Sequence, residues 1–161
     1  MNTEADFIFP YVPSMQESFR NGTLVREWAR KYPELFDGDD MRILGTEHQR
    51  KYHFFEWLSA VVLYETTGFL GLMEKYTAKA HPRKLGVFSN MVSSDLFEFV
   101  MRSQSGLPDL FSFHPDTGEW FFSEVKGGAD TLKENQREKM MQLFERTGKK
   151  VRIIHVNEVK P

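Results

Sequence analysis

The segment SGLPDLFSFHPDTGEWFFSEVKG, residues 105–127, decides the fold that this sequence predicts. Two short runs rich in aromatic residues, 109–114 and 119–126, flank the sequence PDTG at positions 115–118. Proline, aspartate and glycine favour a tight turn, because proline fixes φ and glycine tolerates a positive φ. Aromatic residues favour strands, which pack their side chains on a pleated surface. The segment therefore predicts a β-hairpin.

Helical patterns surround this hairpin on both sides. A capping box at Thr46–Gln49 indicates a helix that runs to about Thr67 and ends at Gly68. Three further helical patterns lie at about 69–79, 82–91 and 94–103, and another, from Thr131 to Thr147, precedes a β-branched strand at Val151–Val156. Helices, a hairpin, a helix and a strand predict an α/β fold with a small mixed β-sheet flanked by helices.

The first part of the chain has a different pattern from the rest. Residues 1–45 read as short helices that are broken at Gly22 and Pro33. We therefore expect a helical N-terminal extension over residues 1–45 and the main domain over residues 46–161. A chain of 161 residues is long enough to bury one core of ordinary size.

The composition excludes several kinds of site. The sequence contains no cysteine, which excludes disulfides, thiolate metal sites and cysteine nucleophiles. The N-terminus lacks a basic region followed by an apolar run, so we expect no secretory signal. No apolar stretch is long enough to span a bilayer. These features favour a cytoplasmic protein without a membrane partner.

Two acidic residues and a lysine are placed to meet on the hairpin. Asp109 begins the first run and Glu124 lies near the end of the second, with the turn midway between them, so they are nearly opposite each other. Glu124 and Lys126 are two positions apart and share one face of their strand. A solvated edge with a cross-strand ion pair has the same pattern. The spacing alone leaves an ion pair and an active site equally open.

An active site with these groups has a recognisable chemistry. Carboxylate oxygens are the ligands that Mg²⁺ and Mn²⁺ prefer. A metal ion polarises a phosphate and lowers the pKa of a bound water. A neighbouring lysine stabilises the negative charge that develops on the phosphate in the transition state. The three residue types therefore fit the hydrolysis of a phosphodiester.

A longer set of residues resembles the VRR-NUC family, a branch of the restriction-endonuclease-like PD-(D/E)xK nucleases. The resemblance covers about residues 100–156 in family order. It is carried by SGLPDL at 105–110, FFSEVKG at 121–127, Asp130, Leu132 and Gln136, and the stretch from Gly148 to Val156. The resemblance implies a restriction-endonuclease-like core and cleavage of DNA that depends on Mg²⁺ or Mn²⁺.

The resemblance also implies roles for individual residues. Asp109 and Glu124 would be metal ligands, together with the backbone carbonyl of Val125. Lys126 would be the catalytic lysine. Gln136 matches a glutamine on the following helix that is expected close to the site.

The family adds a glutamate from an upstream helix, for which this chain offers two candidates. Glu56 and Glu65 are nine positions apart, about half a turn of phase on a helix, and both have apolar helical neighbours. The pattern of residues does not choose between them. The resemblance favours Glu56 as a catalytic residue and metal ligand.

Basic residues outside this site are candidates for contacts with the DNA backbone. Residues 75–84 contain four cations and no acid, and the late helix offers two more, one turn apart. The candidates are Lys75, Lys79, Arg83, Lys84, Lys133 and Arg137. A solvated helix end is an equally good interpretation of the cluster at 75–84.

The sequence thus predicts a metal-dependent DNA endonuclease. The resemblance implies a preference for branched or flap DNA, in repair, recombination or phage DNA processing, and stand-alone family members suggest a homodimer. One alternative is an inactive module that keeps the nuclease fold for binding nucleic acid. Another is a nuclease that acts on RNA, because nothing in the sequence separates RNA from DNA.

Overall fold

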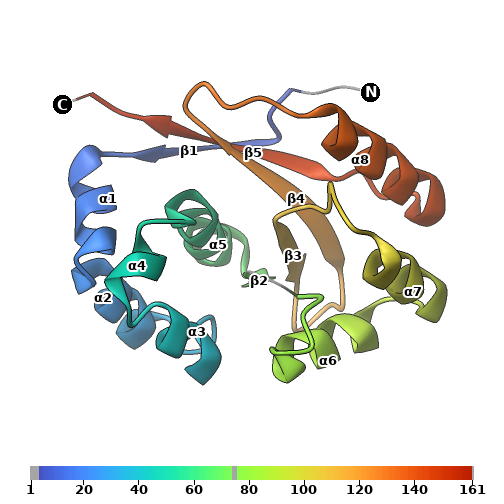
Figure 1. The fold of residues 1–161 in the computed structure, drawn as a ribbon, viewed down its shortest axis with the longest axis horizontal. Coiled ribbons are helices and arrows are strands. Elements are labelled where there is room, and N and C mark those ends of the chain that lie inside the picture. The colour runs from blue at the N-terminus through green and yellow to red at the C-terminus, as the bar shows by residue number, and fades with distance from the viewer. Residues whose placement is uncertain (1–3, 74–75, 161) are drawn as a thin grey trace.

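The computed structural model, which describes residues 4–73 and 76–160, has a five-stranded sheet with the order β1-β5-β4-β3-β2 (Figure 1). β1, β5 and β4 are parallel, whereas β4, β3 and β2 are antiparallel. The strands are β1 (Phe7–Tyr11), β2 (Leu70–Leu72), β3 (Leu110–Phe113), β4 (Trp120–Gly127) and β5 (Arg152–Glu158). The predicted α/β class with a small mixed sheet is confirmed.

Helices cover both faces of the sheet. They are α1 (Pro13–Arg20), α2 (Thr23–Lys31), α3 (Gly38–Ile43), α4 (Glu47–Arg50), α5 (Phe54–Thr67), α6 (Pro82–Met91), α7 (Ser94–Arg102) and α8 (Glu134–Thr147). One core cluster joins the sheet to α1, α2 and α5, and a second joins it to α6, α7 and α8 (Figure 1). Side chains alternate between the two clusters, with Phe121 in the first and Phe122 in the second. Among residues 4–73 and 76–160, no helix has the length and apolar character to cross a membrane.

The predicted hairpin is formed by β3 and β4. Leu110 pairs with Ser123 and Phe113 with Trp120. The same register places Asp109 beside Glu124, one position beyond the last pair of the ladder. The prediction of the hairpin is confirmed. Its turn and its aromatic runs are neighbours in the sequence, so the pattern could be recognised without tertiary information.

The N-terminal segment and residues 69–79 differ from the predictions. The prediction of helices alone in residues 1–45 missed β1, which pairs with β5 and supplies an edge strand. The helix predicted at 69–79 is wrong, because Leu70–Leu72 forms β2 against β3; residues 74 and 75 lie outside the described part of the chain. The boundary at residue 46 stays a prediction.

Two observed helix boundaries also differ from the predicted ones. The helix predicted from Thr46 to Thr67 is two helices, because the chain breaks at Lys51–His53, where His53 has a φ of 64°. A non-glycine residue at positive φ cannot continue a helix. α8 begins at Glu134 rather than Thr131, and the backbone N–H of Lys133 donates to Gln136 Oε1 at its first turn.

Gly106, which precedes β3 of the hairpin, occupies a position that requires glycine. Its φ is +79°, and a Cβ there would overlap the carbonyl oxygen of Asn135 in α8. We expect Gly106→Ala to lower the free energy of unfolding by about 2–5 kcal/mol, the sum of left-handed strain and a steric clash. The matched control is Gly118→Ala. Gly118 also has a positive φ, +76°, but no atom lies within 4 Å of the position that a Cβ would take. This substitution should cost only about 1–2 kcal/mol. Equal losses in urea unfolding would refute close packing at Gly106.

Candidate active site

Asp109 and Glu124 form an adjacent pair of carboxylic acids, of which Glu124 is buried and Asp109 is half-buried. Asp109 Oδ2 accepts a hydrogen bond from the Val125 backbone N–H at 2.8 Å, which fixes the carboxylate against β4. Glu124 is only 1% exposed. Burial, followed by the charge of Asp109, raises the pKa of Glu124 to about 8. Burial also raises the pKa of Asp109, although the Val125 N–H opposes this shift. Two adjacent carboxyls in this setting cannot both ionise easily without a cation.

Lys126 and Gln136 hold Glu124 from two elements. Lys126 Nζ lies 3.2 Å from Glu124 Oε1 and 3.7 Å from Asp130 Oδ2. Gln136 Nε2, in the first turn of α8, donates to Glu124 Oε1 at 2.9 Å. Glu124 and Lys126 belong to the sheet face that packs on α8, because they alternate in phase with Phe122. The structure thus brings together Asp109, Glu124, Lys126 and Gln136.

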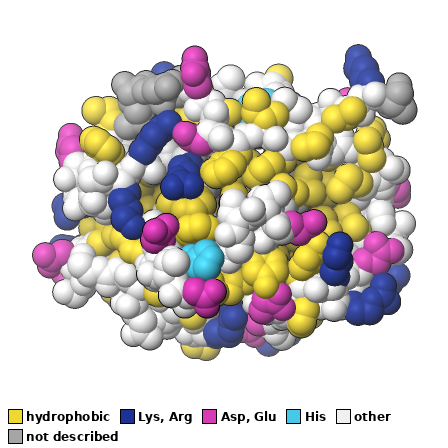
Figure 2. Space-filling view, turned by 180° about the vertical axis from the view of Figure 1, so that it is seen from behind, with side chains coloured by type: hydrophobic (Ala, Val, Ile, Leu, Met, Phe, Trp, Pro, Cys, Tyr) yellow, Lys and Arg dark blue, Asp and Glu magenta, His cyan; other side chains and the backbone are white. Residues whose placement is uncertain are grey.

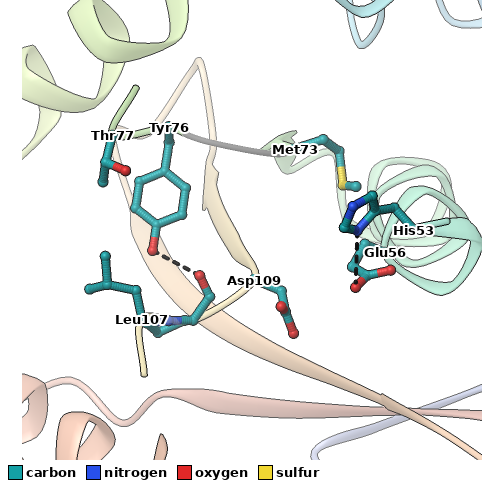
Figure 3. Close-up of a pocket in the computed structure, with 8 residues that line it drawn as sticks. His53, Glu56, Met73, Tyr76, Thr77, Leu107 and Asp109 are labelled. Carbon is teal, nitrogen blue, oxygen red and sulfur yellow. Dashed lines mark hydrogen bonds and ion pairs between the residues drawn. The ribbon is translucent and has the colours of Figure 1, made fainter. Parts of the chain in front are cut away.

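A cavity of about 280 Å³ opens beside Asp109. Its lining residues are His53, Glu56, Met73, Tyr76, Thr77, Leu107, Pro108 and Asp109. Figure 3 shows His53 and Glu56, at the N-terminal end of α5, to one side of Asp109. His53 Nδ1 lies 3.7 Å from Glu56 Oε1. The cavity gives a substrate access to one side of the carboxyl pair.

Tyr76 is a site residue that the sequence did not reveal. Its hydroxyl donates to the Pro108 carbonyl at 2.9 Å, so it positions the residue that precedes Asp109 (Figure 3). Burial, followed by the charges of Asp109 and Glu124, raises the pKa of Tyr76 well above its usual value. Tyr76 lies in a segment that was predicted as helix, and no motif marks it.

The two candidate glutamates of α5 lie in different surroundings. Glu56 lines the cavity with Asp109, and its charge contributes to the raised pKa of Asp109. Glu65 instead lines a separate cleft together with Tyr32. The geometry therefore supports Glu56, whose role as a ligand stays a prediction.

The two adjacent carboxyls of Asp109 and Glu124 fit a hard divalent cation. The donors are carboxylate oxygens, the ligands that Mg²⁺ and Mn²⁺ prefer. Lys126 compensates the pair only in part, since the pKa of Glu124 is raised even with that ammonium beside it. In the described part of the chain, no group of three or more His, Asp or Glu side chains is close enough to hold a metal ion. The pair would supply two carboxylates to a metal ion.

Lys84 corrects the predicted set of DNA contacts. It is 2% exposed, ion-pairs with Asp40 and donates to the Met73 carbonyl at 2.7 Å. Its ammonium also lies 5.7 Å from the centre of the Trp57 ring. A buried, paired lysine cannot reach a phosphate. Its contacts instead join α6 to α3 and the end of β2.

The other predicted DNA contacts differ in their exposure and in their ion pairs. Arg83 is exposed, but it ion-pairs with Asp37 at 3.0 Å. Lys79 is exposed, and Lys75 lies outside the described residues. Lys133 and Arg137 are exposed at the start of α8, beside Gln136. The last two are therefore the predicted cations nearest to the carboxyl pair along the chain.

Comparison with known proteins identifies one domain. Residues 79–158 match the VRR-NUC domain, and this range contains Asp109, Glu124, Lys126 and Gln136 but not Glu56. The crystal structure of "paFAN1 bound to 2nt 5'flap DNA with gap" is similar at a TM-score of 0.35 and 18% sequence identity. The similarity covers 92% of this chain, which spans only 26% of that chain. No curated protein matches the sequence.

Proposed function

Residues 79–158 form a VRR-NUC domain, and from this premise we propose that the protein is a metal-dependent nuclease that hydrolyses phosphodiester bonds in DNA. One observation carries the proposal: this domain holds an adjacent pair of carboxyls, buried Glu124 and half-buried Asp109, with the ammonium of Lys126 beside Glu124. Such a pair is costly to bury unless a cation binds there. We propose further that the preferred substrate is branched or flap DNA.

Asp109 and Glu124 would hold the metal ion, with the Val125 carbonyl as a further ligand. Glu56 lines the same cavity and would join them after its side chain moves closer, because the three carboxylates are not grouped closely enough in this structure. A bound Mg²⁺ or Mn²⁺ would polarise the phosphate and provide a nucleophilic water at neutral pH. Asp109 is already oriented by the Val125 N–H, and Glu124 by Gln136 and Lys126. These contacts preorganise the ligands, so little reorientation is needed when substrate enters.

Lys126 provides a fixed positive charge beside the carboxyls. Its Nζ lies 3.2 Å from Glu124 Oε1 and 3.7 Å from Asp130 Oδ2. An ammonium in this position stabilises the negative charge that develops on the phosphate. It has no lone pair for a metal ion, so we propose a role in catalysis rather than in metal binding.

The direct test is cleavage of labelled nucleic acids of one sequence. Duplex, single-stranded, flap and four-way-junction DNA, with matched RNA, are incubated with Mn²⁺ or with EDTA. We expect cleavage only with Mn²⁺, and faster on flap or junction than on linear DNA. Cleavage in EDTA would contradict the metal site, and equal rates on all DNAs would remove the structure preference. Preferential cleavage of RNA would replace DNA as the substrate.

The metal-free protein should lose stability as the pH rises. The folded state raises the pKa of Glu124 from its ordinary 4.5 to about 8. Between these pH values, folded Glu124 keeps a proton that the unfolded chain releases, so the stabilisation present below pH 4.5 is lost as the pH rises towards 8. We expect a loss of at least about 1 kcal/mol, or about 2–4 °C in Tm, between pH 5 and pH 8 in EDTA.

Thermal unfolding in EDTA and in Mn²⁺ at both pH values measures this effect. Mn²⁺ should raise the Tm more at pH 8, where the carboxyls are ionised, than at pH 5. Glu124→Gln is the control, because it removes the titrating group and should flatten the pH dependence. A wild-type pH profile that matches that of Glu124→Gln would show that Glu124 does not titrate in this range.

A further inference from the structure

A groove of about 440 Å³ between α7 and α8 is lined by cations. The lining residues are Phe99, Arg102, Ser103, Gln104, Lys139, Gln142 and Arg146. None of these described residues is acidic, so the groove carries a local charge of +3 on a chain with a net charge of −2. Figure 2 shows the rear face of the molecule, on which Lys and Arg side chains are mixed with Asp and Glu around a hydrophobic area.

Two of the three cations of the groove lie over the Phe99 ring. The Arg146 guanidinium lies 3.9 Å from the centre of the Phe99 ring, and Lys139 Nζ lies 4.9 Å from it. Lys139 also donates to Ser103 Oγ at 3.0 Å. A guanidinium that stacks on a ring uses its face and keeps its N–H edge for an anion. The groove is therefore preorganised for an anionic ligand.

Arg102, the last residue of α7, is the third cation that lines the groove. It pairs with Glu98 at 3.2 Å, but the two side chains are 78% and 65% exposed. Exposed pairs of this kind contribute little energy and exchange readily for another anion. Arg102 is therefore available to a phosphate.

Two segments of the chain, α8 and the residues before β3, connect the groove with the carboxyl pair. Lys139 follows Gln136 by one turn of α8, and Gln136 contacts Glu124. From Ser103 the chain passes Gly106, which packs on α8 at Asn135, and reaches Asp109. At a rise of about 1.5 Å per residue, Gln136 to Arg146 spans about 15 Å of α8. That length corresponds to about four phosphates of one strand of duplex DNA.

We propose that the α7–α8 groove binds the phosphate backbone of the DNA strand that enters the active site. The inference rests on the proposed nuclease function and adds a binding track to it. An ammonium and two guanidinium groups along one groove complement the negative charges of a phosphodiester backbone. Contacts to phosphates alone fix the position of the strand without reading its sequence. The groove should therefore contribute affinity that is independent of sequence and sensitive to salt.

The test is a double charge reversal, Arg102→Glu with Arg146→Glu. Its control, Arg26→Glu with Arg30→Glu, makes the same change in net charge on α2, which packs on the opposite face of the sheet. Binding to a labelled duplex in EDTA is followed by fluorescence anisotropy at several salt concentrations. We expect the groove variant to raise Kd about tenfold at low salt and to reduce the slope of log K against log salt by about 2. The control should change Kd less than twofold.

A neutral variant and a cleavage assay separate the possible outcomes. Arg102→Gln with Arg146→Gln should give a smaller rise in Kd and the same loss of slope. If the wild type cleaves DNA but both groove variants bind like the control, the groove proposal is overturned and the nuclease function stands. If the wild type neither binds nor cleaves any DNA with Mn²⁺, the nuclease function fails and the groove proposal with it. A larger effect on matched RNA than on DNA would overturn the assignment to a DNA strand.

Discussion

Lys126→Ala is expected to reduce DNA cleavage by about 10²–10³-fold while divalent metal binding stays intact. The ammonium stands 3.2 Å from Glu124 Oε1 and is 7% exposed, so it lies inside the carboxyl site rather than at its edge. It cannot ligate a metal ion, but it can stabilise the charge of the transition state. Its loss also removes a competing cation from Glu124. The affinity for Mn²⁺ should therefore be equal to that of the wild type or higher.

Asp109→Ala and Glu124→Ala should behave differently from Lys126→Ala. Each removes a proposed metal ligand, so each should abolish both Mn²⁺ binding and cleavage. Titration calorimetry with Mn²⁺ and cleavage of labelled DNA measure the two properties separately. Lys126→Met keeps most of the side-chain volume in this buried position, and it distinguishes loss of charge from loss of packing.

A second lysine serves as the matched control for Lys126. Lys150→Ala removes a surface ammonium that pairs with Asp6 at 3.0 Å, and it should leave both activity and metal binding unchanged. Wild-type cleavage by both Lys126 variants would refute a catalytic role for this lysine. Loss of Mn²⁺ binding in Lys126→Met would instead indicate that the lysine organises the ligands.

The centre of the candidate site was predictable because its signals are local. The turn at residues 115–118 fixes the register of β3 and β4, and this register alone sets Asp109 beside Glu124. The two-residue period of a strand then puts Lys126 on the face of Glu124. Sequence separation is short throughout, so tertiary context had little to override.

Features that depend on distant pairing were not predictable. Phe7 pairs with Ile154, which lies 147 positions later (154 − 7), and nothing in the FIFPY sequence of β1 specifies that partner. Lys84 looked like part of a basic surface because charge patterns carry no information about burial. Its ion pair with Asp40, 44 residues away, turns a predicted DNA contact into a buried link between helices.

The choice between Glu56 and Glu65 was predictable only in part. Both are on α5, but helical phase could not orient them, because α5 is apolar on nearly all sides. The structure separates them by their neighbours. Glu56 shares a cavity with Asp109, and its charge acts on that carboxyl, whereas Glu65 lines a different cleft with Tyr32. A pair of isosteric variants on one helix can therefore test the upstream ligand.

Glu56→Gln is expected to reduce Mn²⁺ affinity and cleavage by about 10–100-fold, the range found when a metal shell is perturbed. The amide keeps the shape of the side chain but removes one negative charge near Asp109. Without metal, this charge opposes ionisation of Asp109. The Tm of the metal-free variant should therefore equal or exceed that of the wild type, while its rise with Mn²⁺ should be smaller. A structural role would instead lower the Tm in EDTA.

Glu65→Gln is the matched control, with the same substitution on the same helix. It should leave cleavage and Mn²⁺ affinity within about twofold of the wild type, because Glu65 lies in the cleft with Tyr32 rather than beside Asp109. Reversed results would make Glu65 the ligand and would require α5 to rotate about its axis relative to this structure. If both variants were fully active, the carboxylates of Asp109 and Glu124 would suffice for the site. The remaining positions on the metal ion would then be left to backbone carbonyl groups, water and the substrate, as Mg²⁺ sites commonly allow.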